Sequence, residues 1–200
     1  LTPQEIFFYR FLIAYIGIWA ISPKHLFADN LKDELWLVAG GVFGGSLYFF
    51  TENTALGITQ ASNVAFIICT APLLTTILSL LFYKSEKATK GLIYGSLLAL
   101  IGVGLVVFNG SVVLKLSPVG DLLTLLAALS WAFYSLVIKR MTGRYPTVFI
   151  TRKIFFYGVL TILPAFLLHP LQPDFDVLLQ PLVLSNLLFL AVLASLICYI

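Results

Sequence analysis

Ala61–Phe82 reads ASNVAFIICTAPLLTTILSLLF and contains no charged residue. A helix of about 20 mostly apolar residues is long enough to cross the hydrocarbon core of a lipid bilayer. The stretch is apolar on every side and lacks the two-residue alternation of a strand in a membrane β-barrel. It therefore predicts a transmembrane helix.

Further stretches of this kind lie on both sides of it. The predicted spans are Pro3–Ile21, Leu35–Ala55, Ala61–Phe82, Gly91–Phe108, Val119–Ile138, Val148–Leu168 and Leu184–Ile200. Of the 200 residues, 60% are hydrophobic and 10% are charged, against about 25% charged residues in a soluble domain. A soluble fold of this size cannot bury so many apolar side chains. We predict an all-α membrane protein, a polytopic bundle with about seven transmembrane helices in this chain.

The basic residues indicate how the spans are oriented. Cytoplasmic loops collect Lys and Arg, and most of the 12 basic residues lie in three alternate connections: Lys24 and Lys32; Lys84, Lys87 and Lys90; Lys139, Arg140, Arg144, Arg152 and Lys153. The pattern predicts a multi-pass protein of the plasma (inner) membrane with residue 1 on the outer side.

The two ends of the chain and a short repeated sequence indicate a larger architecture built from repeats. The chain starts at Leu1 without Met and stops inside an apolar stretch, so we expect further helices at both ends. Ile6–Tyr9 recurs as Ile154–Tyr157, in spans of opposite predicted orientation. Repeats of opposite topology are common in secondary transporters, which bind their substrate between the repeats.

Several stretches carry a resemblance to a known family. They are Leu37–Gly41, Thr54–Ser62, Thr70–Leu74, Ser85–Lys87, Gly95–Val103 and Gly120–Tyr134. Together they resemble the EamA-like family of the drug/metabolite transporter superfamily, and Arg10 looks like the arginine of its second helix. The resemblance implies ten helices in two inverted five-helix repeats. Residues 1–110 would then form a first repeat without its first helix, and residues 118–200 a second repeat without its last two.

Arg10 and Glu52 lie unmistakably inside apolar spans. An ionisable group there costs about 2.5 to 3.5 kcal/mol on insertion scales, so it needs a partner or a cavity. Both residues lie within roughly 10 Å of the predicted outer ends, at about 1.5 Å per residue. We predict that they pair and face an outward cavity. The alternative is a structural pair near the interface, with Arg10 extending to water.

The predicted substrate-binding set comprises Arg10, Tyr48, Glu52, Asn53, Asn63, Trp131 and Tyr134. The asparagines offer hydrogen bonds, and the faces of the rings suit cationic or apolar solutes. Aromatic residues also gather at membrane interfaces without any ligand. Pro72 and Pro164 predict helix kinks, which either aid transport or are structural bends.

Other residues give weaker indications. Gly40-Gly41 with Gly44-Gly45, and Gly91 with Gly95, have the spacing of close helix packing, for which a homodimer face is the alternative. The two cysteines and His25 and His169 show no metal-ligand spacing. We predict no cofactor and no metal site.

The leading function is secondary transport of a small-molecule substrate, a metabolite or drug-like solute, by alternating access, and the resemblance favours export. The predicted surroundings are the lipid bilayer, without nucleic acid, and a homodimer of the chain is an open alternative to a single copy. An intramembrane enzyme acting on lipid-linked substrates and a non-transporting membrane scaffold are the alternatives. Motifs for hydrolysis or ATP binding do not occur, so we predict that the chain is not an enzyme.

Overall fold

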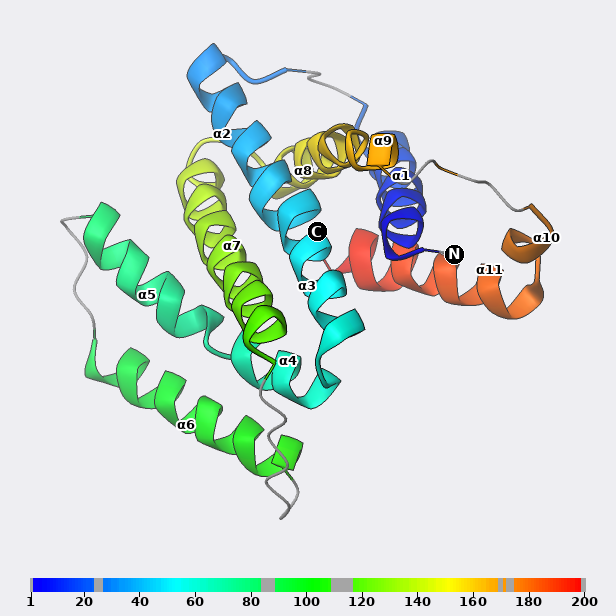
Figure 1. The fold of residues 1–200 in the computed structure, drawn as a ribbon. Coiled ribbons are helices and arrows are strands. Elements are labelled where there is room, and N and C mark those ends of the chain that lie inside the picture. The colour runs from blue at the N-terminus through cyan, green and yellow to red at the C-terminus, as the bar shows by residue number, and fades with distance from the viewer. Residues whose placement is uncertain are drawn as a thin grey trace. The chain divides into compact units, whose positions relative to one another are not determined.

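The computed structural model of the chain describes residues 2–23, 27–83, 89–108, 117–168, 171 and 175–198. In these ranges the regular elements are helices, and no strand occurs (Figure 1). The chain consists of two compact units. Unit 1 consists of Leu1–Ser46 and Val137–Ile200, and unit 2 consists of Leu47–Leu136.

Unit 1 is built around helix α8, against which α1 and α2 both pack (Figure 1). The π-helical segment η2 lies along α1. The elements of unit 1 are α1 (Pro3–Ile21), α2 (Leu31–Gly41), η1 (Val42–Ser46), the last residues of α7 (Pro118–Thr142), α8 (Thr147–Ile162), α9 (Ala165–Leu168), α10 (Phe175–Leu178), α11 (Pro181–Leu188) and η2 (Phe189–Ile197).

Glycines allow close contact between η1 and α8. A Cβ atom on Gly45 would lie 3.2 Å from the Cα atom of Gly158, and one on Gly41 would lie 2.4 Å from the Cβ atom of Tyr157. Phe11 and Phe155 are fully buried, with ring centroids 4.9 Å apart. The helix-packing role predicted for this glycine cluster is confirmed, because a Cβ atom at Gly41 would clash with α8 and one at Gly45 would force its neighbours apart.

Unit 2 contains α3 (Leu47–Ile58), α4 (Ala61–Ile68), α5 (Ala71–Phe82), α6 (Lys90–Phe108) and most of α7. Helix α4 packs against α3 and α6, and α5 packs against α6. The predicted span Ala61–Phe82 is thus two helices, α4 and α5, with a turn at Cys69–Thr70 between them.

The lengths of the helices suit a membrane. In the described part of the chain, four helical stretches are long and apolar enough to cross a bilayer: Gln4–Ile21, Ala61–Phe82, Pro118–Thr142 and Thr147–Leu167. Lys90–Leu105 and Pro181–Ile197 are shorter apolar helices. The remaining predicted span, Leu35–Ala55, falls on the consecutive elements α2, η1 and α3.

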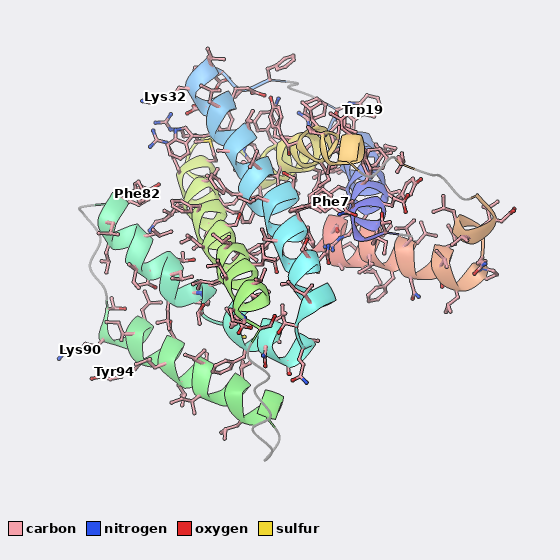
Figure 2. All side chains as sticks on the ribbon, viewed as in Figure 1. Phe7, Trp19, Lys32, Phe82, Lys90 and Tyr94 are labelled. Atoms are coloured by element: carbon pink, nitrogen blue, oxygen red, sulfur yellow. The ribbon has the colours of Figure 1, made fainter. Side chains whose placement is uncertain are left out.

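Large apolar and aromatic side chains lie on the surface of both units. Trp19, Phe82 and Tyr94 are 48%, 64% and 67% exposed, and Figure 2 shows all three on their helices. Lipid tails accept such side chains, whereas water opposes their exposure. The predicted polytopic helical bundle is confirmed.

Some predictions are not tested by this architecture. The division into repeats at 1–110 and 118–200 differs from the two compact units and stays a prediction. His25, His169, Lys24, Lys84, Lys87 and Lys115 lie outside the described residues.

Candidate functional site

One carboxylate and three aromatic rings of the predicted binding set lie together in unit 2. Tyr48 and Glu52 are four residues apart on α3, so they share one face of this helix. The Tyr48 hydroxyl donates a hydrogen bond to Glu52 Oε1 over 3.0 Å. The ring of Trp131, on α7, lies 5.1 Å from the ring of Tyr48 and 5.1 Å from the ring of Tyr134. We call these four residues the aromatic–carboxylate cluster.

The chemistry of this cluster favours a cation. Tyr134 is buried, whereas Tyr48, Glu52 and Trp131 are half-buried and keep some accessible surface. The faces of aromatic rings carry partial negative charge and attract ammonium and guanidinium groups. The carboxylate of Glu52 adds a full negative charge when it is ionised. The cluster therefore matches an organic cation joined to an apolar body.

The two asparagines of the predicted set lie on neighbouring helices. Asn53 is half-buried on α3, and Asn63 is 3% exposed on α4. Consecutive residues in a helix are about 100° apart around its axis, so Asn53 points in a different direction from Glu52. A role for either asparagine in binding a solute stays a prediction.

Arg10 belongs to unit 1, where its partner is a serine. Its Nε donates a hydrogen bond to Ser195 Oγ on η2, and Ser195 is buried. The guanidinium also lies 5.9 Å from the ring of Phe11. The pair predicted between Arg10 and Glu52 would join residues of different units and stays a prediction.

Both prolines that were predicted to kink helices lie beside interruptions of helices. Pro72 is the second residue of α5, directly after the turn at Cys69–Thr70. Pro164 lies in the turn between α8, which ends at Ile162, and α9, which begins at Ala165. A proline has no N–H to donate within a helix, which accounts for breaks at these places.

Four charged residues outside the predicted set form ion pairs in unit 1. Arg144 Nη1 donates to Asp33 Oδ1 over 2.9 Å and to Asp33 Oδ2 over 3.1 Å. Lys153 Nζ, on α8, donates to Glu34 Oε1, on α2. We call these two pairs the unit 1 charge cluster. The Glu34–Lys153 pair joins α2 to α8.

The pair between Glu34 and Lys153 is well enclosed. Their side chains are 14% and 4% exposed. The hydroxyl of Tyr157 also donates to Glu34 Oε1, and the backbone N–H of Ala28 donates to Glu34 Oε2 over 2.7 Å. Lys153 Nζ lies 4.6 Å from the ring centroid of Phe27. Buried groups can stay ionised when they are paired and hydrogen-bonded in this way.

The sequence prediction for this region was wrong in one respect. It counted Arg152 and Lys153 with a cytoplasmic connection although the predicted span Val148–Leu168 contains them, and both lie inside α8 and are buried. The sequence did contain a signal for their burial, because both residues lie between two largely apolar stretches, Phe149–Thr151 and Ile154–Tyr157. Two acidic residues, Asp33 and Glu34, supplied the complementary charge near the start of another span.

Asp33 has a lowered pKa although its side chain is buried. Burial alone would raise the pKa of this carboxyl. Hydrogen bonds from Asn30, Arg144 and Tyr145, together with the charge of Arg144, outweigh that effect and bring the pKa below the ordinary value of 3.8. The folded protein therefore stabilises the ionised form of Asp33.

The lowered pKa leads to a prediction about pH. Because the pKa is lower in the folded state, ionised Asp33 contributes its full stabilisation above the unfolded-state value and loses it as the pH falls through the folded-state value. We expect Asp33→Asn to lower the melting temperature of the full-length protein in detergent at pH 7. The gap from the wild type should close as the pH drops below about 3.8. An unchanged gap at low pH would contradict this, and exposed Asp176→Asn, on α10, is the control.

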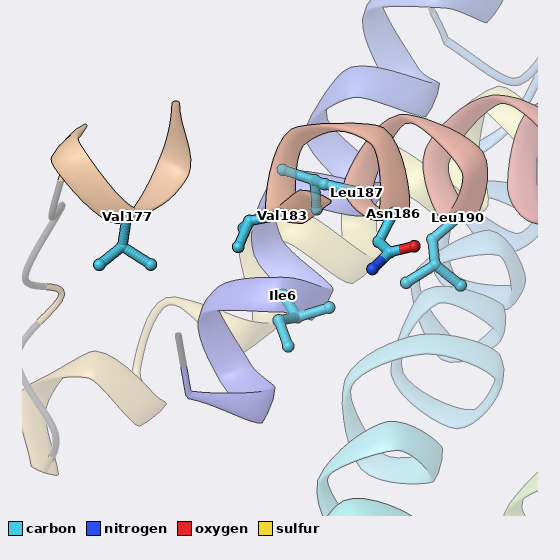
Figure 3. Close-up of a pocket in the computed structure, with 6 residues that line it drawn as sticks. All are labelled: Ile6, Val177, Val183, Asn186, Leu187 and Leu190. Carbon is cyan, nitrogen blue, oxygen red and sulfur yellow. The ribbon is translucent and has the colours of Figure 1, made fainter. Parts of the chain in front are cut away.

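An apolar cavity of about 270 Å³ lies between α1 and the C-terminal helices of unit 1 (Figure 3). Its lining residues are Ile6, Val177, Val183, Asn186, Leu187 and Leu190. Of these, Asn186 alone has a polar side chain. Such a lining suits a hydrocarbon chain better than a charged solute, so this cavity is a weaker candidate for the solute site than the aromatic–carboxylate cluster.

The described residues contain no group of three or more His, Cys, Asp or Glu side chains that could hold a metal ion.

Comparison with known proteins places these features in a family. The model of the EamA-like transporter family matches residues 1–108 and 118–200. An uncharacterized transporter of Archaeoglobus fulgidus is 26% identical over 204 residues, covering 100% of this chain and 69% of that protein. The uncharacterized transporter YdfC of Bacillus subtilis is 31% identical over 147 residues, covering 72% of this chain and 47% of that protein. The chain thus spans about half the length of YdfC.

A solved structure shares the fold. A protein known by its crystal structure superposes with a TM-score of 0.76 over 100% of this chain and 68% of that chain, at 18% sequence identity. At this identity the likeness concerns the fold alone.

The family match and the names of the relatives identify a multi-pass membrane transporter, and they point to transport rather than to enzymatic catalysis. Because the family model matches nearly the whole chain, the chain belongs to the EamA-like transporter family of the drug/metabolite transporter superfamily.

Proposed function

We propose that the protein is a secondary transporter for small organic solutes that carry a cationic group on an apolar body. In this proposal the aromatic–carboxylate cluster binds the cationic end of the solute. The observation that carries the proposal is the Tyr48–Glu52 hydrogen bond of 3.0 Å beside the ring of Trp131. The hydrogen bond from Tyr48 fixes the orientation of the Glu52 carboxylate toward a bound solute.

The expected energies are sufficient for selective binding. An ammonium group on an aromatic face gains about 0.5 to 2 kcal/mol, depending on how far it is desolvated. A hydrogen bond from that ammonium to a carboxylate contributes about 1.5 to 3 kcal/mol. A neutral analogue of the solute would lose most of both contributions. The cluster would therefore distinguish cationic from neutral solutes.

The direction and mode of transport form the second part of the proposal. We infer export from the plasma (inner) membrane by alternating access between the two predicted repeats, with residue 1 on the outer side. The excess of Lys and Arg on alternate connections supports this orientation. The helix interruptions beside Pro72 and Pro164 offer places where helices can bend during the change of access.

Trp131 provides a test of the solute site. A survey of cationic and matched neutral solutes in inverted vesicles containing the full-length protein should find accumulation of cations. We expect Trp131→Ala to reduce kcat/KM for these cations about tenfold, because the ring face is lost. Trp131→Phe should retain a larger part of the activity, since it keeps an aromatic face.

The control for this test is Trp19→Ala, which removes an exposed ring from α1. It should leave transport unchanged at equal expression. Equal kcat/KM for Trp131→Ala and the wild type would remove the cluster from the mechanism.

A further inference from the structure

A second cavity in unit 1, of about 290 Å³, lies where several spans end. Its wall includes Ser22, which follows the span Gln4–Ile21. It also includes Arg144 and Tyr145, which lie between the spans Pro118–Thr142 and Thr147–Leu167. Residues directly beyond the ends of spans lie at the level of the lipid headgroups. The cavity is therefore placed at a membrane–water interface.

Two opposite charges line this cavity. Arg144 has a half-exposed side chain. Among the described residues, its side chain donates hydrogen bonds through the Nη1 atom alone, and both of these go to Asp33. A guanidinium has five N–H donors, so Arg144 can bind a second anion. Asp29 is exposed, and within the described ranges no side chain or backbone group donates a hydrogen bond to its carboxylate. The cavity thus offers one cationic and one anionic partner.

The hydroxyl of Tyr145 links the two charged sides. It accepts a hydrogen bond from the backbone N–H of Asp29 over 3.1 Å and donates one to Asp33 Oδ2 over 3.1 Å. Because Asp33 also accepts hydrogen bonds from Arg144, these contacts connect the backbone of Asp29 to Arg144 through Tyr145 and Asp33. Both residues line the same cavity of about 290 Å³, so one small ligand inside it can meet both charges.

Aromatic rings form the rest of the wall. The rings of Tyr145 and Phe149 stack with centroids 5.1 Å apart and an angle of 27° between their planes. Phe27 also lines the cavity. Arg152 contacts two residues of the wall, since it donates to the backbone oxygen of Ser22 and lies 5.5 Å from the ring of Phe149. These contacts form the cavity before any ligand enters.

We propose that this cavity binds the headgroup of a zwitterionic phospholipid with a primary ammonium, namely phosphatidylethanolamine. The phosphate binds the guanidinium of Arg144, and the ammonium binds the carboxylate of Asp29 beside the aromatic wall. The negative charge of Asp29 disfavours a purely anionic headgroup such as phosphatidylglycerol. A choline headgroup has no N–H to donate to Asp29. The size of the cavity, at the lower end for small-molecule sites, fits a headgroup.

The test is lipid retention by the purified full-length protein in detergent, measured by native mass spectrometry. Phosphatidylethanolamine, phosphatidylcholine and phosphatidylglycerol with the same acyl chains are offered in equal amounts. We expect about tenfold higher retention of phosphatidylethanolamine, and Asp29→Asn should abolish this preference. Asp29→Lys should shift the preference to phosphatidylglycerol, because the wall then carries two cations.

Asp176→Asn, on α10, is the matched control and should keep the preference of the wild type. Equal retention of the three lipids by the wild type, or an unchanged preference in Asp29→Asn, would overturn the proposal. Free phosphoethanolamine is a further competitor, and it should not displace the lipid at equal concentration. Displacement at that concentration would assign the cavity to a soluble zwitterion and overturn the lipid assignment.

Discussion

Lys153→Met is expected to lower the free energy of unfolding of the full-length protein by about 3 kcal/mol. The substitution keeps an apolar side chain of similar length but leaves the carboxylate of Glu34, which is 14% exposed, without its cation. Removing one partner of a buried ion pair leaves an uncompensated charge and typically costs about 3 to 5 kcal/mol. Protonation of Glu34 limits the loss, which places the expected value at the lower end.

The double variant Glu34→Gln with Lys153→Met separates the pair from the packing around it. It removes both charges and should lie within about 1 kcal/mol of the wild type, since a neutral pair leaves no buried charge. Lys32→Met, at the exposed start of α2, is the control and should change stability by less than about 0.5 kcal/mol. Unfolding in mixed detergent micelles measures all three. Wild-type stability for Lys153→Met would show that the pair does not hold α2 to α8.

Glu52→Gln should raise KM for a cationic solute about tenfold or more, while a neutral solute is transported as before. The amide has nearly the same shape and still accepts the hydrogen bond from Tyr48, so the helix should stay intact. The loss comes from the missing charge, because a hydrogen bond to a charged group is worth about 1.5 to 3 kcal/mol. Transport into inverted vesicles, at matched expression, gives the two constants separately.

Glu52→Asp is the conservative control for this prediction. It keeps the charge and should restore part of the affinity. Arg10→Gln, measured alongside it, tests the pair predicted from the sequence between Arg10 and Glu52. Unchanged kcat/KM for cationic solutes in both Glu52→Gln and Arg10→Gln would exclude these residues from solute binding.

The sequence predicts most of the helices because the spans follow from length and apolar composition alone. The predicted span Pro3–Ile21 agrees with α1. This helix begins with a capping box, in which Thr2 Oγ1 accepts from the N–H of Glu5 over 3.3 Å and Glu5 Oε2 accepts from the N–H of Thr2 over 2.8 Å. The interruptions inside spans are harder to foresee. The π-helical segments η1 and η2 depend on tertiary packing, which local composition does not encode.

The binding cluster could be predicted in part. Tyr48 and Glu52 are four residues apart, so their proximity on one helix face follows from helix geometry. The contact of Tyr48 with Trp131 joins residues far apart in the chain, and such a contact depends on how α3 and α7 pack. The buried ion pair of Lys153 was not predicted, because the orientation rule treats every Lys and Arg of a connection as exposed to water. Only the position of α2 beside α8 reveals its partner, Glu34.

The most direct test of the account is the fluorescence of Trp131 as the solute binds. In full-length protein with every other tryptophan replaced by phenylalanine, a transported cationic solute should change this fluorescence saturably. The half-saturating concentration should match KM for transport and should rise about tenfold in Glu52→Gln. Unchanged Trp131 fluorescence at saturating solute, with transport intact, would contradict the claim that the aromatic–carboxylate cluster is the solute site.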